Sequence, residues 1–108
     1  MDAMAEITGG VCGLKTVVRA TCTDGVTVLL NVSSDCQRIC AMAGEMPTLD
    51  AVEEGLSKPV NETMPVVLAA EHKLHSSCLV PVGILKAVEV AAGLALPCLC
   101  HVELSRSG

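Results

Sequence analysis

The sequence predicts an α+β domain in which helices pack on one face of a three-stranded antiparallel sheet. Two segments near the start and one near the end alternate apolar and polar residues, as strands do, and the segments between them have helical apolar spacing. A chain of 108 residues is long enough for one core and too short for two. We therefore expect a single domain over residues 1–108, poorly ordered at residues 1–10, with the element order β-β-α-α-α-α-β.

The first two strands are expected over residues 11–23 and 26–32, with turn-forming residues between them. A three-residue turn brings both apolar faces to one side of the sheet and pairs Ala20 with Val28. A two-residue turn mixes polar and apolar residues on each face. We therefore predict the three-residue turn.

Four helices are expected after this hairpin, at residues 33–46, 48–56, 65–75 and 81–96. Ser33 and Ser34 are suitable caps for the first helix, and Thr48 is suitable for the second. Pro65 and Pro81 suit first helical positions, where a backbone N–H has no partner within the helix. The last helix is apolar around most of its circumference, so we expect it to lie buried at the centre of the domain.

The last helix also carries a stripe of small residues, Ala87, Ala91 and Ala95, where another backbone can approach closely. We expect this stripe to contribute to a homodimer contact. Residues 98–104 alternate again and are expected to form the closing strand, with both of its cysteines facing the core. This strand is predicted to pair antiparallel with the first strand, which gives the strand order 2-1-3.

Composition and charge exclude several classes of partner. The chain has no Phe, Tyr or Trp, so it lacks the aromatic platforms on which single-stranded nucleic acids stack. With only seven Lys and Arg and a net charge of −5, it also lacks a phosphate-binding surface. The apolar stretch at residues 78–100 is interrupted by two prolines, Lys86 and Glu89, which argues against a membrane span. We expect no nucleic-acid partner and no membrane partner.

Cysteine usage indicates the cellular compartment. The chain has seven cysteines and no C-x-x-C motif, and its first ten residues lack the basic and apolar regions of a signal peptide. Because seven is an odd number, at least one thiol stays unpaired within the chain. We therefore expect a cytoplasmic protein with reduced thiols rather than a disulfide scaffold.

The predicted strand order brings four candidate ligands to one end of the sheet. Cys12 begins the first strand, and Cys36 begins the first helix at the same height on the neighbouring strand. The last helix runs antiparallel to the closing strand, so its start, with Cys78 and His75, is expected at the Cys12 end. Strand order 1-2-3 would instead send Cys78 to the far end.

The four residues have the chemistry of a soft-metal site. Three thiolates and an imidazole form a complete tetrahedral ligand set for zinc, and thiolates also bind iron. Cys36 and Cys78 lie at expected helix starts, where free backbone amides favour a thiolate. We therefore predict that Cys12, Cys36, Cys78 and His75 bind a soft metal or a metal-bearing cofactor. Without a metal, two of these thiols could act as a redox pair.

Two alternatives remain open. The first is a structural or interaction domain, homodimeric, whose cysteines are core residues, because cysteine packs as a small hydrophobe; His75 would then interact with carbonyls at a helix end. The second is an enzyme that uses Lys86 and Glu89 beside the thiols. The other carboxylates, Glu54 among them, fall on polar faces or loops and are expected to face solvent.

The stretches VCGLKTVV, NVSSDCQRI and HSSCLVPVGILKAVEVAAGLALP resemble motifs of a family of small, uncharacterised, cysteine-containing proteins of archaea and anaerobic bacteria. That family has a Cys-Gly, then a Ser-Asp-Cys, then Cys-x-Val-Pro followed by Lys-Ala-x-Glu-Val-Ala-x-Gly-Leu-Ala-Leu-Pro. The resemblance spans nearly the whole chain and selects Cys12, Cys36 and Cys78 from the seven cysteines. Leu79 stands where proline is common in the family. The resemblance implies a cytosolic protein and no particular reaction.

Overall fold

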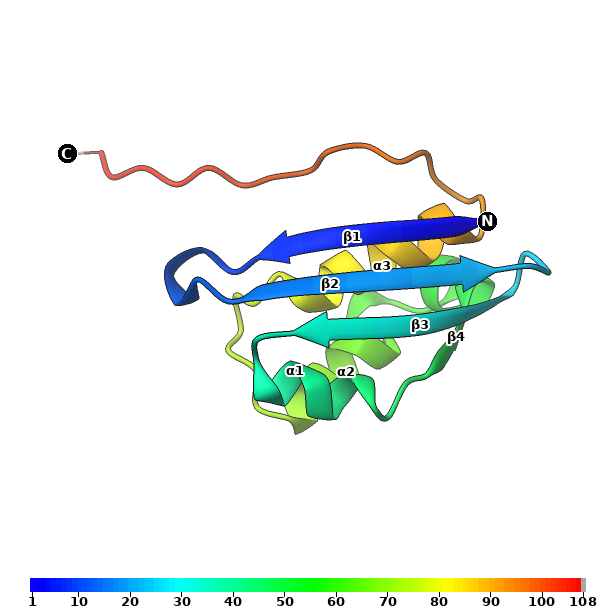
Figure 1. The fold of residues 1–108 in the computed structure, drawn as a ribbon, viewed down its shortest axis with the longest axis horizontal. Helices are drawn as coiled ribbons and strands as arrows, with labels where there is room; N and C mark the ends of the chain where they lie inside the picture. Colours follow the sequence, from blue (N-terminus) through cyan, green and yellow to red (C-terminus); the bar gives the residue numbers. More distant parts are fainter. Residues whose placement is uncertain (108) are drawn as a thin grey trace.

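The computed structural model describes residues 1–107 as a four-stranded antiparallel sheet, in the order β1-β2-β3-β4, with helices on one face (Figure 1). The strands are β1 (Asp2–Thr8), β2 (Lys15–Cys22), β3 (Thr27–Ser34) and β4 (Thr48–Asp50). The α-helices are α1 (Gln37–Ala43), α2 (Met64–Glu71) and α3 (Val80–Ala91). Three short helical segments complete the chain: η1 (Gly10–Cys12), η2 (Glu53–Ser57) and η3 (Val60–Glu62). The predicted α+β class with helices on one face is confirmed, whereas three strands in the order 2-1-3 is wrong.

The largest difference from the prediction is β1, which lies where disorder was expected. It pairs with β2 over its whole length, with Ala3 opposite Ala20 and Ala5 opposite Val18. β1 therefore occupies the side of β2 that the sequence assigned to residues 98–104, and in the described chain that segment forms no strand. The inward residues of β1 are mostly alanine, so its alternation gave a weak strand signal.

The hairpin of β2 and β3 keeps the predicted faces with a different register. Ala20 pairs with Leu30 rather than Val28, a shift of two residues that leaves the apolar side chains on the helix side. The cause is Asp24, whose carboxylate accepts hydrogen bonds from the amides of Val26 at 2.9 Å and Thr27 at 2.8 Å. These bonds favour a loop of five residues between the paired Cys22 and Val28 over the predicted three.

The second predicted helix, at residues 48–56, is replaced by β4 and η2. Leu49 is buried opposite Val28 at the edge of the sheet, so this short segment contributes to the core as a strand. Asp50 then accepts a hydrogen bond from the Glu53 amide at 2.9 Å and caps the turn into η2, a π-helical segment. The other three predicted helices are present with shorter bounds.

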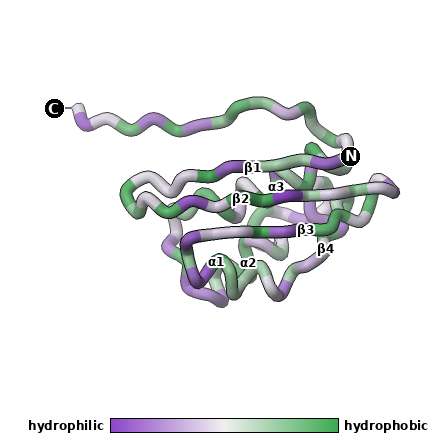
Figure 2. The backbone as a smooth tube through the Cα atoms, in the orientation of Figure 1, coloured by the Kyte–Doolittle hydropathy of each residue, from purple (hydrophilic) through white to green (hydrophobic). Residues whose placement is uncertain are grey.

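The core lies between the sheet and α3, which packs against β1 and β2 (Figure 1). Aliphatic side chains and methionines fill it, and Val18, Val28, Ile84 and Val88 are completely buried. Figure 2 shows hydrophilic and hydrophobic colours alternating along the strands.

Two residues of the small-residue stripe of α3 pack inside one chain, while the homodimer itself stays a prediction. Ala87 and Ala91 are 3% and 1% exposed, so they belong to the core within one chain and are not open to a second copy. A Cβ atom added at Gly83 would lie 2.3 Å from Cδ1 of Ile7, which shows how closely α3 approaches the end of β1. Gly93, beyond the other end of α3, lies near Met1, so α3 runs antiparallel to β1.

Among the described residues, no helix is both long enough and apolar enough to cross a membrane.

Candidate functional site

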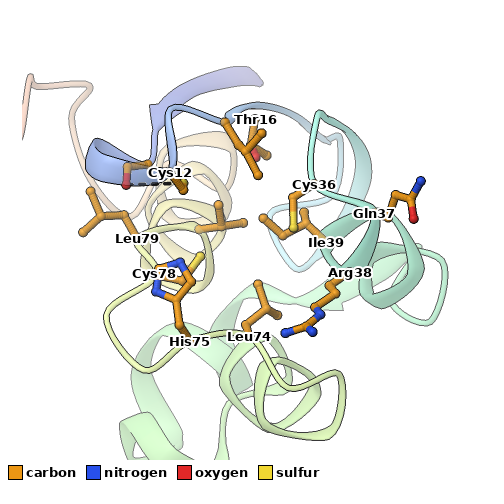
Figure 3. A pocket seen from close by; sticks show the side chains of 13 residues that line it. Cys12, Thr16, Cys36, Gln37, Arg38, Ile39, Leu74, His75, Cys78 and Leu79 are labelled. Carbon is orange, nitrogen blue, oxygen red and sulfur yellow. Dashed lines mark hydrogen bonds between the residues drawn. The ribbon is translucent and has the colours of Figure 1, made fainter.

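A pocket of about 420 Å³ opens at the end of the sheet where β1 ends and β2 and α3 begin. Its walls include Cys12, Cys36, Cys78 and His75, the four residues singled out in the sequence (Figure 3). They come from η1, the start of α1 and the connection before α3, so three segments distant in sequence form one cavity. Apolar side chains supply most of the remaining wall: Leu14, Ile39, Leu74, Leu79 and Val80.

The position of Cys12 depends on Gly9. The thiol donates a weak hydrogen bond to the Gly9 carbonyl oxygen at 3.5 Å. A Cβ atom added to Gly9 would lie 2.3 Å from the Cys12 sulfur, so only glycine leaves the thiol in this place. The backbone of Gly9, with φ of −82°, would accept other residues, which makes this a constraint of space rather than of conformation.

Cys36 is fixed by a small network at the same end of the sheet, where β3 ends beside the start of β2. Its amide donates to the Ser34 hydroxyl at 3.1 Å, and that hydroxyl is 2.7 Å from the hydroxyl of Thr16, which is buried in the pocket wall. Two further hydrogen bonds join Asp35 to Lys15. The Asp35 amide donates to the Lys15 carbonyl oxygen at 2.9 Å, and the Lys15 amide donates to the Asp35 carboxylate at 3.2 Å. The half-buried Cys36 then begins α1 at the edge of the pocket.

Cys78 and His75 lie in the turn that precedes α3. The Cys78 amide donates to the His75 carbonyl oxygen at 3.1 Å, which closes the turn, and Pro81 is buried in the first turn of the helix. The His75 ring is exposed, with Nδ1 3.3 Å from the Ser77 hydroxyl. Cys78 is half-buried, so its thiol is reachable from the cavity.

Arg38 is a pocket residue that the sequence analysis missed. Its guanidinium donates to the Lys73 carbonyl oxygen at 2.7 Å and so joins α1 to the connection between α2 and α3. Lys73 has a φ of 58°, in the left-handed region, which turns this carbonyl out of the helical path. The partner is a backbone atom 35 residues away, so no local pattern could have indicated it.

The charge of the pocket contrasts with that of the whole protein. The chain carries a net charge of −5, yet no Asp or Glu occurs among the described residues that line the cavity. Among the described lining residues, the basic side chains are those of Arg38 and His75. The pocket therefore offers thiols, an imidazole and a guanidinium on largely apolar walls, a lining suited to soft or anionic groups.

The thiols surround the pocket without forming a closed cluster. Within residues 1–107, no group of three His, Cys, Asp or Glu side chains is arranged to hold a metal ion, and all seven cysteines are free. The predicted neighbourhood of the four residues agrees with the pocket lining, although the closing strand and strand order from which it was inferred are wrong. The role of these residues as metal ligands stays a prediction.

The other cysteines lie elsewhere. Cys22 is buried in the core at the turn end of β2, and Cys40 is exposed on α1, with its thiol 3.3 Å from the Ser34 carbonyl oxygen. Cys98 and Cys100 are exposed, so their predicted place in the core is wrong.

The alternative catalytic pair is not supported by its placement. Lys86 is exposed and Glu89 is half-buried on α3. Neither is among the residues that line the pocket.

A second feature missed in the sequence is Glu54, which was expected in solvent and is 6% exposed. Its carboxylate accepts a hydrogen bond from the Lys58 ammonium at 2.8 Å and another from the Met64 amide at 2.8 Å. The hydrogen bond to Glu54 is the main reason that the pKa of Lys58 is raised above its ordinary value. With both oxygens paired inside the chain, this carboxylate joins η2 to the start of α2.

Comparison with protein families identifies the chain at the level of family. A family model matches residues 3–104, which covers nearly the whole fold and all the pocket residues. The chain belongs to DUF6951, a family of unknown function. No curated protein and no solved structure matches this DUF6951 protein. Its function therefore has to be inferred from the pocket itself.

Proposed function

We propose that this DUF6951 protein binds a soft metal, as a small metal-bearing cofactor, in the pocket lined by Cys12, Cys36 and Cys78. The observation that carries the proposal is that three thiols and the His75 imidazole, from separate segments, line one cavity that has no carboxylate among its described walls. Thiolates are the ligands that zinc, iron–sulfur clusters and copper(I) prefer, whereas carboxylates prefer harder ions.

The volume of the cavity and the separation of its thiols favour a cofactor over a bare metal ion. A cavity of about 420 Å³ lies within the range of small-molecule sites, and it is far larger than a single tetrahedral ion needs. The thiols also lie apart rather than in a ready-made cluster. A cofactor with several metal or sulfur atoms can reach thiols on different walls, while the apolar side chains cover its remaining surface.

The experiment is an anaerobic titration of the reduced protein with Co²⁺, and, in a second arm, reconstitution with ferrous iron and sulfide. Both probes absorb light when bound to thiolates, and a chain without Phe, Tyr or Trp contributes almost no near-ultraviolet background. We expect charge-transfer absorption in at least one arm. Serine at position 12, 36 or 78 should weaken it by at least about 100-fold, because even second-shell changes cost 10- to 100-fold.

Cys40→Ser is the matched control for Cys36→Ser. Both thiols belong to the region of α1, but Cys40 is exposed and does not line the pocket. Gly9→Ala supplies a further variant, since it displaces the Cys12 sulfur while retaining all seven thiols. The proposal is rejected if neither probe binds, or if Cys40→Ser weakens binding as much as Cys36→Ser does.

A further inference from the structure

The segment after α3 has the sequence pattern of a strand and no strand partner. Within the described chain, residues 92–107 contain no helix or strand, and the backbone hydrogen bonds outside regular elements end at the Leu94 amide. Figure 2 shows apolar and polar residues alternating along this segment. From residue 96 on, its large apolar side chains, Leu96, Leu99, Val102 and Leu104, are between 67% and 90% exposed. So much exposed apolar surface in one short stretch indicates a missing contact.

The edge of the sheet at β1 offers a matching surface. β1 pairs with β2 on one side only, and in the described chain no strand pairs with its other side. Its seven residues contain no proline, so every free amide and carbonyl on that side can bond an added strand. Residues 98–104 are also seven in number. The alternate residues Cys98, Cys100, Val102 and Leu104 share one face of such a strand. Once added, this face would continue the helix-side layer that Ala3, Ala5 and Ile7 begin.

The geometry favours the β1 edge of a second copy over the segment's own β1. Leu96 and Pro97 line a surface hollow together with Met1 and Asp2, so the segment starts beside the start of β1. In Figure 1 it then runs in the same direction as β1. Pairing within one chain would be parallel, which is less stable per residue than antiparallel pairing, and no such bonds form. A second copy can approach in the antiparallel direction.

We propose that two copies of this chain exchange residues 98–104, each adding the segment as an antiparallel fifth strand to β1 of the other copy. A two-fold axis makes the exchange reciprocal, so one dimer contains two added strands. Backbone hydrogen bonds at the edge supply the affinity, and burial of Val102 and Leu104, which share one face of the added strand, adds to it. The contact is independent of the metal proposal, because none of its residues lines the thiol pocket.

The test measures the mass and the amide exchange of the full chain in the presence of a reductant. We expect a species of twice the 11.1 kDa chain mass over a wide concentration range. We also expect slow exchange for the alternate β1 amides that do not bond β2. A variant that ends at Leu96 should be monomeric, with those β1 amides exchanging rapidly, while circular dichroism shows that the sheet and helices remain.

Two separate proline variants test the same contact while keeping residues 98–104 in the chain. In a strand, adjacent amides point to opposite sides, so His101→Pro and Val102→Pro should differ, and only one of them should lose an interchain bond. The proposal is overturned by a monomeric full chain, by a dimer that disappears on reduction, or by a dimer that persists in the variant ending at Leu96. Loss of the dimer without any change in β1 exchange would also overturn it.

Discussion

The two ends of α3 gather polar side chains in opposite ways. Near its C-terminal end, where Gly55 lies beside Glu89, Glu54 is buried with both carboxylate oxygens bonded, one to the Lys58 ammonium and one to the Met64 amide. At its N-terminal end, the thiols of Cys12, Cys36 and Cys78 face a cavity of about 420 Å³, and the one hydrogen bond among them is weak.

This difference separates a structural polar group from an available one. A buried carboxylate whose oxygens are satisfied inside the chain has no capacity left for a ligand, and removing it leaves its partners unpaired. Replacing a thiol that has only weak partners on a cavity wall should change the free energy of unfolding little. Such a thiol can still bind a ligand that enters the cavity. Stability should therefore depend on the Glu54 end, and binding should depend on the pocket end.

The largest effect on stability is expected for Glu54→Ala, which removes both hydrogen bonds and leaves space in the packing. We expect a loss of about 2 to 3 kcal/mol in the free energy of unfolding, measured by urea titration with circular dichroism. Glu53→Ala is the matched control, because its carboxylate is 58% exposed and lies 3.6 Å from the same ammonium. That control should cost less than about 0.5 kcal/mol.

The same urea titration, applied to a pocket variant, compares the two ends of α3. Cys36→Ser should change the free energy of unfolding by less than about 1 kcal/mol, since within residues 1–107 the hydrogen bond of Cys36 to Ser34 uses its amide and none uses its thiol. Glu54→Ala, in turn, should leave Co²⁺ binding of the folded protein unchanged. An equal loss of stability in both variants would show that the two ends do not differ as described.

A smaller loss is expected where α3 meets β1. Gly83→Ala places a methyl group against Ile7, and we expect it to cost about 1 to 2 kcal/mol, because the far end of the Ile7 side chain can partly move away. Ile7→Ala removes the clash, so the double variant should be more stable than the sum of the two single changes predicts. Purely additive effects would mean that β1 does not pack on α3 in this way.

The sequence predicted the class of the fold and the convergence of the cysteines better than it predicted the sheet. The β2 and β3 strands and α3 have strong apolar periodicity, and their long-range packing follows from it. β1 was missed because Ala3 and Ala5 give a weak pattern, and the stronger pattern of residues 98–104 was assigned its place. Cys12 and Cys78 still meet, because α3 runs antiparallel to β1 and begins at its end.

Two hydrogen bonds, one at the pocket and one near the other end of α3, could not be predicted from the sequence. Arg38 bonds to a backbone carbonyl of Lys73, and Glu54 bonds to the backbone amide of Met64. Every residue except proline has such an amide, and every residue has such a carbonyl, so the identity of the partner says nothing in advance. Only the folded chain shows which of them each side chain reaches.

The smallest expected effect is at Asp24, in the turn at the end of β2 away from the pocket. Hydrogen bonds from the Val26 and then the Thr27 amide lower the pKa of the Asp24 carboxyl below its ordinary value of 3.8. Because the folded-state pKa is the lower one, the contribution to stability is complete above pH 3.8 and disappears as the pH falls through the folded value. Asp24→Ala should therefore destabilise the protein slightly at neutral pH, and the difference from the unaltered chain should shrink in acid.

Urea titrations at neutral and acidic pH measure this difference, and Asp24→Asn serves as the control because its side-chain oxygen can still accept from the same two amides. That variant should retain most of the stability at neutral pH and lose the dependence on pH. Since the turn lies at the end of β2 opposite the pocket, Co²⁺ binding at neutral pH should be the same for all three proteins. A change in Co²⁺ affinity on altering Asp24 would show that the two ends of the sheet are coupled, which contradicts the separation of roles between them.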